Sequence, residues 1–164
     1  MKNNATLITI PKLTFRYGTD ADEVFFHNKL LEGKDNGYLG FHGVEVDIFK
    51  NNKYKVSIVV LADDKLAGFT ILSSDDLVGF DYIDEIYILK EFRRNGIGTK
   101  LLEFAEDYCK KNWNGKGIDL YTLDNDPMEL IVKKAGFKFS GYYKKKGFRH
   151  GKLYGQKRWF KLYE

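Results

Sequence analysis

One short segment constrains this chain more than any other: residues 93–98, which read Arg-Arg-Asn-Gly-Ile-Gly. A run rich in β-branched and aromatic residues, 82–89, precedes it, and a helical pattern follows it. Glycines between a strand and a helix let an anion approach the N–H groups of the helix start, and two arginines add positive charge. The segment therefore predicts a site for a phosphate or pyrophosphate, with a glycine turn that is only a connector as the alternative.

Two well-known phosphate motifs do not fit this segment. A dinucleotide-binding fingerprint requires a third glycine at the position of Leu101. A P-loop requires Gly-Lys-Ser/Thr, whereas this chain has Gly98-Thr99-Lys100. The predicted phosphate site therefore belongs to another class of motif.

The length and composition favour one ordinary globular domain over residues 1–164. Of the 164 residues, 43% are hydrophobic and 30% are charged, a balance that disordered chains lack. We find no apolar run of about 20 residues and no secretion signal at the start of the sequence. The single cysteine, Cys109, cannot form an internal disulfide, and it lies on an apolar helical stripe with Leu101, Ala105 and Tyr108, which predicts a buried thiol. These features lead us to expect a cytoplasmic protein.

Charge is distributed unevenly along the chain. Residues 138–164 contain nine Lys or Arg and one acid, net +8, which leaves residues 1–137 at net −4 of the total of +4. Such a basic segment suits nucleic acid or the phosphates of a cofactor, and a solvated hairpin is the simpler interpretation. Interleaved Tyr and Trp residues in the segment would suit stacking on bases.

Periodicity and turn residues predict an order of strands and helices. We expect a strand over 5–16 that is broken by Pro11, a helix that starts at a capping box at Asp20 and ends near Gly33, and an undecided segment at 34–52. A hairpin over 54–62 and 66–72 and a strand over 82–89 lead into the glycine turn and its helix. A strand at 118–123, a helix from Asp126 to Gly136, and two strands, from Phe137 and over 153–163, complete the chain. The order predicts an α/β (α+β) fold with helices on the faces of a mixed sheet.

Two segments resemble the signatures of the GCN5-related N-acetyltransferase (GNAT) family. Residues 88–102, Ile-Leu-Lys-Glu-Phe-Arg-Arg-Asn-Gly-Ile-Gly-Thr-Lys-Leu-Leu, are similar to the family's acetyl-CoA motif, Arg/Gln-x-x-Gly-x-Gly/Ala after a strand. Asn125, Val132 and residues 133–137, Lys-Lys-Ala-Gly-Phe, resemble its Asn-x6-Tyr-x3-Gly-Phe segment. The resemblance implies a single GNAT-like domain, with a mostly antiparallel mixed sheet of about six to seven strands and about four helices.

The resemblance also implies an activity and a cofactor site. The activity is N-acetyl transfer, an acyltransferase reaction in which a primary amine attacks the thioester of acetyl-CoA directly, with acetyl-CoA as co-substrate and no metal. The implied cofactor-binding residues fall into three groups: the pyrophosphate turn with Arg93, Arg94, Asn95, Gly96, Ile97, Gly98 and Thr99; a strand beside the pantetheine arm with Ile86, Tyr87 and Ile88; and Asn125 opposite that strand.

The catalytic base is expected among two adjacent acids. An alkylammonium has a pKa of about 10.4, so a base must remove a proton before the nitrogen can attack. Glu85 and Asp84 lie where similar family members carry such acids, and we prefer Glu85 with Asp84 as the alternative. A regular strand directs only one of the two toward the cofactor, and a β-bulge, common in this strand of the family, removes that restriction. A backbone N–H of Ile86 or Tyr87 is the corresponding donor to the carbonyl oxygen.

The leaving group has no obvious proton donor. Val132 stands where many relatives have a tyrosine. A thiol has a pKa of about 8.5, so a thiolate leaves with little need for an acid. Tyr142 or Tyr143 is the alternative proton donor, although two aromatic residues in a strand are more typical of the core.

The acceptor is predicted only by class, as a small polycationic amine or a peptide amine. Acids close in the sequence (Asp75, Asp76, Asp81, Asp84 and Glu85) would attract a cation if they border the cleft. Two alternatives remain: a module that binds acetyl-CoA without transfer, which the valine at 132 suggests, and nucleic-acid binding through the basic segment. The three histidines (His27, His42 and His150) are too dispersed for a metal site, and a homodimer fits the family.

Overall fold

The computed structural model describes residues 11–32, 49, 51–75, 77–149 and 152–164. In chain order the elements are β1 (Leu13–Tyr17), α1 (Asp20–Glu32), β2 (Lys55–Ala62), β3 (Lys65–Asp75), β4 (Phe80–Ile88), the 3₁₀ helix η1 (Lys90–Phe92), α2 (Ile97–Asn112), β5 (Gly117–Leu123), α3 (Met128–Lys134), β6 (Lys138–Arg149) and β7 (Lys152–Leu162). The predicted α/β class with a mixed sheet is confirmed. Among the described residues the helices are three α-helices and one 3₁₀ helix, against about four expected.

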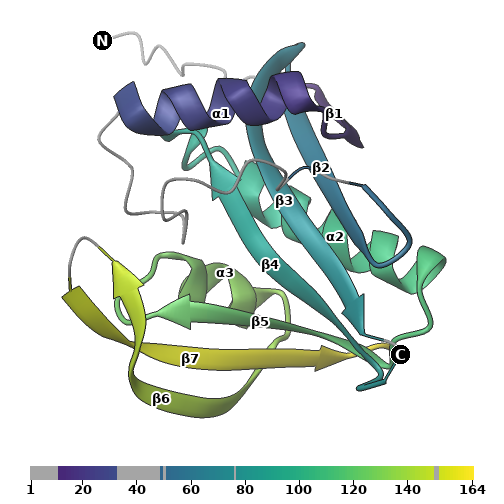
Figure 1. Cartoon of the computed structure of the whole chain (residues 1–164), viewed down its shortest axis with the longest axis vertical. Helices are drawn as coiled ribbons and strands as arrows, with labels where there is room; N and C mark the ends of the chain where they lie inside the picture. Colours follow the sequence, from purple (N-terminus) through teal and green to yellow (C-terminus); the bar gives the residue numbers. More distant parts are fainter. Residues whose placement is uncertain (1–10, 33–48, 50, 76, 150–151) are drawn as a thin grey trace, which may run out of the picture.

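Seven strands form one sheet in the order β1-β2-β3-β4-β5-β7-β6 (Figure 1). Neighbouring strands are antiparallel except for β4 and β5, which are parallel. A parallel pair needs a crossover connection, and α2 supplies it. The sheet therefore matches the predicted six to seven mostly antiparallel strands.

The first half of the sheet is built on a tight hairpin. Strands β2 and β3 are joined by Asp63 and Asp64, which have φ angles of 47° and 63°. Positive φ at both turn residues is what a two-residue hairpin requires, and Asp is among the residues that accept it. Strand β1 pairs with β2 and begins at Leu13, so Pro11 and Lys12 of the strand predicted over 5–16 precede it, and residues 5–10 lie outside the described residues.

Helices α1 and α2 cover opposite faces of the sheet (Figure 1). Strand alternation explains the division, because Val59 packs with the α1 side and its neighbours Ile58 and Val60 with the α2 side. Phe26 of α1 packs on Phe69 of β3, with ring centroids 4.8 Å apart. The side of the sheet that α1 covers is called the α1 face below.

The apolar stripe of α2 is buried as predicted. Leu101, Ala105 and Cys109 have no exposed surface, and Tyr108 is partly buried. The Cys109 thiol is a core group, and burial raises its pKa above the ordinary value. No helix within the described part of the chain is long and apolar enough to cross a membrane.

Candidate active site

The N-terminus of α2 is open to a ligand. Gly96 precedes the helix with φ 75°, a left-handed conformation that favours glycine, and no side chain caps the first turn. The backbone ladder begins with the N–H of Lys100, which donates to the Gly96 carbonyl oxygen at 3.1 Å. An α-helix leaves the preceding N–H groups, here from Ile97 to Thr99, without an intrahelical acceptor. The first turn carries no acid, so these N–H groups face a position that suits an anion.

The two arginines of the turn have different surroundings. Arg93 Nε donates to the carbonyl oxygen of Ile88 at 2.8 Å, and the guanidinium lies 5.4 Å from the ring centroid of Tyr87. Arg94 is exposed and has φ 65°. Arg93 thus braces the turn against the end of β4, a contact that sequence reasoning did not predict, and Arg94 lies at the surface of the turn.

Gly98, in the first turn of α2, lies close to α3 and to the end of β4. A Cβ atom placed on this residue would lie 3.4 Å from Cδ1 of Ile131 in α3 and 3.7 Å from Cγ1 of Ile88 in β4. A Cβ on Gly96, by contrast, would have no described atom within 4 Å. A side chain at residue 98 would therefore contact both β4 and α3, whereas Gly96 leaves room in front of the helix terminus.

Strands β4 and β5 separate next to this turn. Their parallel pairing covers only Asp81–Ile83 with Ile118–Leu120. Beyond it, β4 continues to Ile88 along β3, β5 continues to Leu123 along β7, and the two strands diverge (Figure 1). The backbone of β4 that was predicted to face a pantetheine arm lies in this divergent part. Asn125, predicted opposite it, lies in the turn after β5, exposed and with φ 63°.

A β-bulge occurs in β4 at the two candidate bases. Ile71 of β3 is opposite Glu85, and its neighbour Leu72 is opposite Ile83, so Asp84 is the extra residue. The expected bulge is confirmed. It breaks strict alternation between Asp84 and Glu85 at the point where β4 leaves β5.

Hydrogen bonds from β3 reach the Asp84 carboxylate and the Glu85 backbone. Ser73 Oγ donates to Asp84 Oδ1 at 3.0 Å, and Thr70 Oγ1 donates to the backbone oxygen of Glu85 at 2.8 Å. Burial raises the pKa of Asp84, against the opposing effects of the Ser73 hydrogen bond and the charge of Lys55. Asp84 is nevertheless exposed, so its carboxylate touches solvent while protein surrounds it at longer range.

The expected substitutes for a tyrosine at 132 are not core residues. Val132 is fully buried in α3, and its carbonyl oxygen accepts the N–H of Phe137. Tyr142 is 50% exposed and donates to Asp124 Oδ2 at 3.0 Å, and Tyr143 is 39% exposed. The prediction that these two tyrosines belong to the core was wrong, because both lie on the edge strand β6.

The acids near β4 do not form one surface cluster. Asp81 is fully buried and accepts hydrogen bonds from Ser74 Oγ and Tyr163 Oη, each at 2.8 Å. Asp75 is half-buried, and residue 76 lies outside the described residues. Of the predicted cation-attracting acids, Asp84 and Glu85 remain at the divergence of the strands.

Lys157, Arg158 and Lys161 of the basic segment form ion pairs with acids of other elements. Lys157 pairs with Glu129 at 2.5 Å, Lys161 pairs with Glu106 at 2.8 Å, and Arg158 pairs with Asp119. The partners lie in α3, α2 and β5. These cations fasten the C-terminal strand to the rest of the domain, so they contribute less to a free basic surface than the sequence suggested.

The structure describes one of the three histidines. His27 is exposed on α1, and His42 and His150 lie outside the described residues. Within the described ranges, the structure contains no group of three or more His, Cys, Asp or Glu side chains that is arranged to hold a metal ion.

Comparison with known proteins gives the class. Residues 20–137 match the model of the acetyltransferase (GNAT) family, so the chain belongs to this family. The family that the sequence resembles is thereby confirmed. A probable N-acetyltransferase 14 from Xenopus tropicalis is 30% identical over 88 residues, which are 53% of this chain and 42% of that relative. The chain thus matches less than half the length of this relative.

Solved structures of acetyltransferases share the fold over nearly the whole chain. RimL, a ribosomal L7/L12 α-N-protein acetyltransferase in complex with coenzyme A, has a TM-score of 0.79 at 14% identity, covering 94% of this chain and 97% of its own. A mutant form of the spermidine/spermine N-acetyltransferase SpeG from Vibrio cholerae has a TM-score of 0.76 at 21% identity, covering 92% and 93%. At these identities the similarity establishes the fold.

Proposed function

We propose that residues 1–164 form one acyl-CoA N-acyltransferase domain that transfers an acetyl group from acetyl-CoA to a primary amine. One observation carries the proposal: the uncapped N-terminus of α2 lies where β4 and β5 diverge. An anion-binding helix end beside an exposed strand backbone suits a ligand with a pyrophosphate at one end and an amide-containing arm at the other.

The residues around this opening fit acetyl-CoA. Backbone N–H groups from Arg94 to Thr99 would bind the pyrophosphate, with Arg93 bracing their turn. The backbone of Ile86–Ile88 would pair with the pantetheine arm as an added strand does, and Asn125 would face the arm from the β5 side. Gly98 supports this path, because a larger side chain there would extend against Ile88 and Ile131 beside the turn.

The bulge supplies the candidate base. Bound acetyl-CoA contributes an activated acyl group, the thioester. Glu85 or Asp84 would take the proton of the acceptor ammonium, directly or through water, so that the neutral nitrogen can attack. The raised pKa of Asp84 strengthens its case, since a base works best when its pKa approaches the working pH. A backbone N–H of Ile86 or Tyr87 would donate to the carbonyl oxygen as negative charge develops there.

The thiolate is proposed to leave without a dedicated acid. Val132 is buried and carries no ionisable group. Because the pKa of a thiol is about 8.5, the thiolate is a good leaving group near neutral pH. The transfer thus breaks the C–S bond and forms the C–N bond. The acceptor nitrogen loses two protons in all: the first goes to the base before attack, and the second goes to water or to the departed thiolate after the C–N bond has formed.

The rival to transfer is binding of acetyl-CoA alone. A thiol-release assay with a polyamine, an aminoglycoside and a peptide amine separates the two, with the acetylated amine identified by mass. We expect CoA release that depends on the amine and falls at least about tenfold in Glu85→Gln or Asp84→Asn. Retention of acetyl-CoA with no release for any amine would favour the binding module.

The acceptor, the location and the assembly are further proposals. SpeG is by name a spermidine/spermine N-acetyltransferase and RimL acts on a ribosomal protein, which supports a polyamine or a peptide amine as acceptor. A cytoplasmic location and a homodimer are proposed from the sequence and the family. Nucleic-acid binding is less favoured, because Lys157, Arg158 and Lys161 are already paired.

A further inference from the structure

Two tyrosines on neighbouring parts of the sheet hold an ammonium of the chain itself. The rings of Tyr121 in β5 and Tyr143 in β6 lie 6.3 Å apart between centroids. Lys146 Nζ is 4.4 Å from the Tyr143 centroid and 6.0 Å from that of Tyr121. Distances of this size allow a cation–π interaction. Both rings are also accessible, at 40% and 39% exposed.

The pair lies at the mouth of the strand divergence. Ile83 and Leu120 form the last rung between β4 and β5, so Asp84 and Tyr121 each stand one residue beyond it. Asp84 and Tyr121 lie on the same face of the sheet, the α1 face. Ser73, whose hydroxyl bonds to Asp84, is opposite Tyr82, and Tyr82 is opposite Asp119. Opposite residues share a face, and Tyr121 comes two residues after Asp119, so it lies on that face as well. A molecule whose amine approaches Asp84 or Glu85 on this face would therefore extend toward the tyrosine pair.

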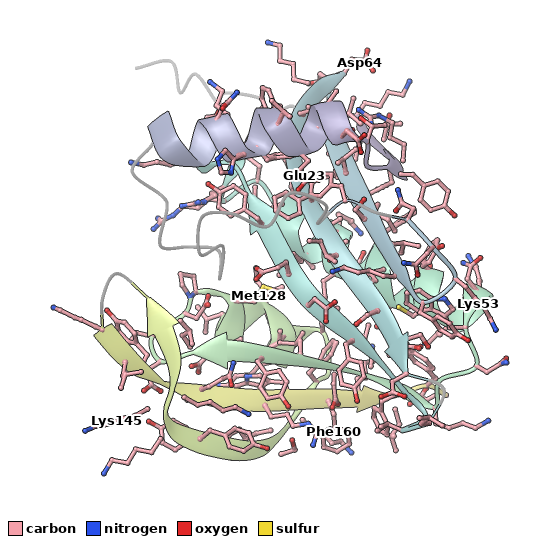
Figure 2. All side chains as sticks on the ribbon, viewed as in Figure 1. Glu23, Lys53, Asp64, Met128, Lys145 and Phe160 are labelled. Atoms are coloured by element: carbon pink, nitrogen blue, oxygen red, sulfur yellow. The ribbon has the colours of Figure 1, made fainter. Side chains whose placement is uncertain are left out.

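An irregularity in β6 accompanies the position of Lys146. Tyr143 is opposite Gln156 and Gly147 is opposite Tyr154, so residues 144–146 bulge opposite a single residue of β7. Lys145 has φ 56° within this bulge. Its side chain points away from the sheet in Figure 2, whereas Lys146 contacts the rings. The bulge presents one lysine of three to the aromatic pair.

The charges around the pair permit one ammonium to replace another. Arg158, opposite Tyr121, is neutralised by its ion pair with the buried Asp119. Lys146 Nζ occupies the rings, so a ligand ammonium would bind there by displacing the Lys146 side chain into solvent. We propose that Tyr121 and Tyr143 bind the distal ammonium of a diamine or polyamine acceptor, and that Lys146 occupies this subsite until the acceptor displaces it. The proposal rests on the proposed acetyl transfer.

The test compares a polyamine with a monoamine. Steady-state kinetics are measured with spermidine and with propylamine, each at saturating acetyl-CoA. Lys146→Ala should lower the KM for spermidine about threefold, because an internal competitor is lost, and should leave the KM for propylamine unchanged. Tyr121→Leu and Tyr143→Leu should raise the KM for spermidine about threefold to tenfold and leave the KM for propylamine unchanged. Tyr143→Phe keeps the aromatic ring, so its KM values should equal those of the parent.

Lys145→Ala is the matched control. It removes the same charge from the same bulge but no contact to the rings, so it separates long-range electrostatics from occupancy of the subsite. Equal KM changes in Lys145→Ala and Lys146→Ala, or equal effects of the tyrosine variants on both amines, would overturn the proposal while transfer itself stands. Absence of transfer to any amine by the folded parent would overturn the proposed function, and this inference with it.

Discussion

Arg93 Nε donates a 2.8 Å hydrogen bond to the carbonyl oxygen of Ile88, so one guanidinium ties the start of the glycine turn to the last residue of β4. The same guanidinium lies against the ring of Tyr87. The relative position of the strand end and the helix terminus, the two halves of the proposed cofactor site, therefore depends in part on this side chain.

Removing the brace should weaken both the fold and the cofactor site. We expect Arg93→Met to lower the free energy of unfolding by about 1–2 kcal/mol and to raise the KM for acetyl-CoA. Arg94→Met removes an equal charge from the exposed neighbour, and its stability should stay within about 0.5 kcal/mol of the parent. Urea unfolding and initial rates measure the two effects. Equal stability of the two variants would show that the brace contributes nothing.

Loss of the Ser73 hydroxyl should alter the pH profile if Asp84 is the base. The hydroxyl stabilises the Asp84 carboxylate, so Ser73→Ala should raise the pKa of Asp84 further. The acidic limb of kcat/KM would then move to higher pH, because the base must lose its proton to act. An unmoved limb in Ser73→Ala that disappears in Glu85→Gln would assign the base to Glu85.

The raised pKa of Asp84 also predicts how stability depends on pH. Because the pKa of Asp84 is higher in the folded state than in the unfolded state, folding favours the protonated carboxyl. The free energy of unfolding therefore falls as pH rises from the unfolded-state pKa through the folded-state pKa. Asp84→Asn should thus raise Tm at pH 7.5, and the gain should vanish at pH values below the ordinary pKa of Asp. Thermal unfolding at several pH values measures this, and a Tm gain that persists in acid would contradict the assigned cause.

The ion pair between Arg158 and Asp119 should be costly to break from one side. Asp119 is fully buried, and its Oδ1 has no hydrogen-bond partner among the described residues. Arg158→Met would leave the carboxylate with neither charge nor donor, at a cost of about 3–5 kcal/mol. Adding Asp119→Asn should recover part of the loss, since the buried charge is removed. Chemical denaturation of the single and double variants gives the coupling, and additive losses would contradict a direct pair.

The sequence contained the local signals of this fold. Gly96 ended up at φ 75° ahead of α2, and the spacing of Leu101, Ala105 and Cys109 placed these side chains in the core. Local chemistry decides such features: a left-handed residue before a helix and an apolar stripe at helical spacing.

Contacts between residues far apart in the chain could not be predicted from the sequence. Arg158 and Asp119 are 39 residues apart, and only the register of β5 with β7 brings them together. The burial of Asp81 likewise depends on Tyr163 at the other end of the chain. Tyr142 and Tyr143 were expected in the core because an aromatic strand pattern does not reveal that the strand is an edge. Edge and centre positions are set by topology, which single-sequence patterns do not encode.

The central claim is that acetyl-CoA binds at the N-terminus of α2, and calorimetric titration of acetyl-CoA tests it most directly. Gly96→Glu places a carboxylate in front of the open helix terminus, and Gly79→Glu is its matched control. Gly79 has φ 73° and equally open surroundings, but it lies at the other end of β4, roughly 25 Å of strand away. We predict binding by the parent and by Gly79→Glu, and binding at least about tenfold weaker by Gly96→Glu. Equal binding by the two folded variants, or none by the folded parent, would contradict the account.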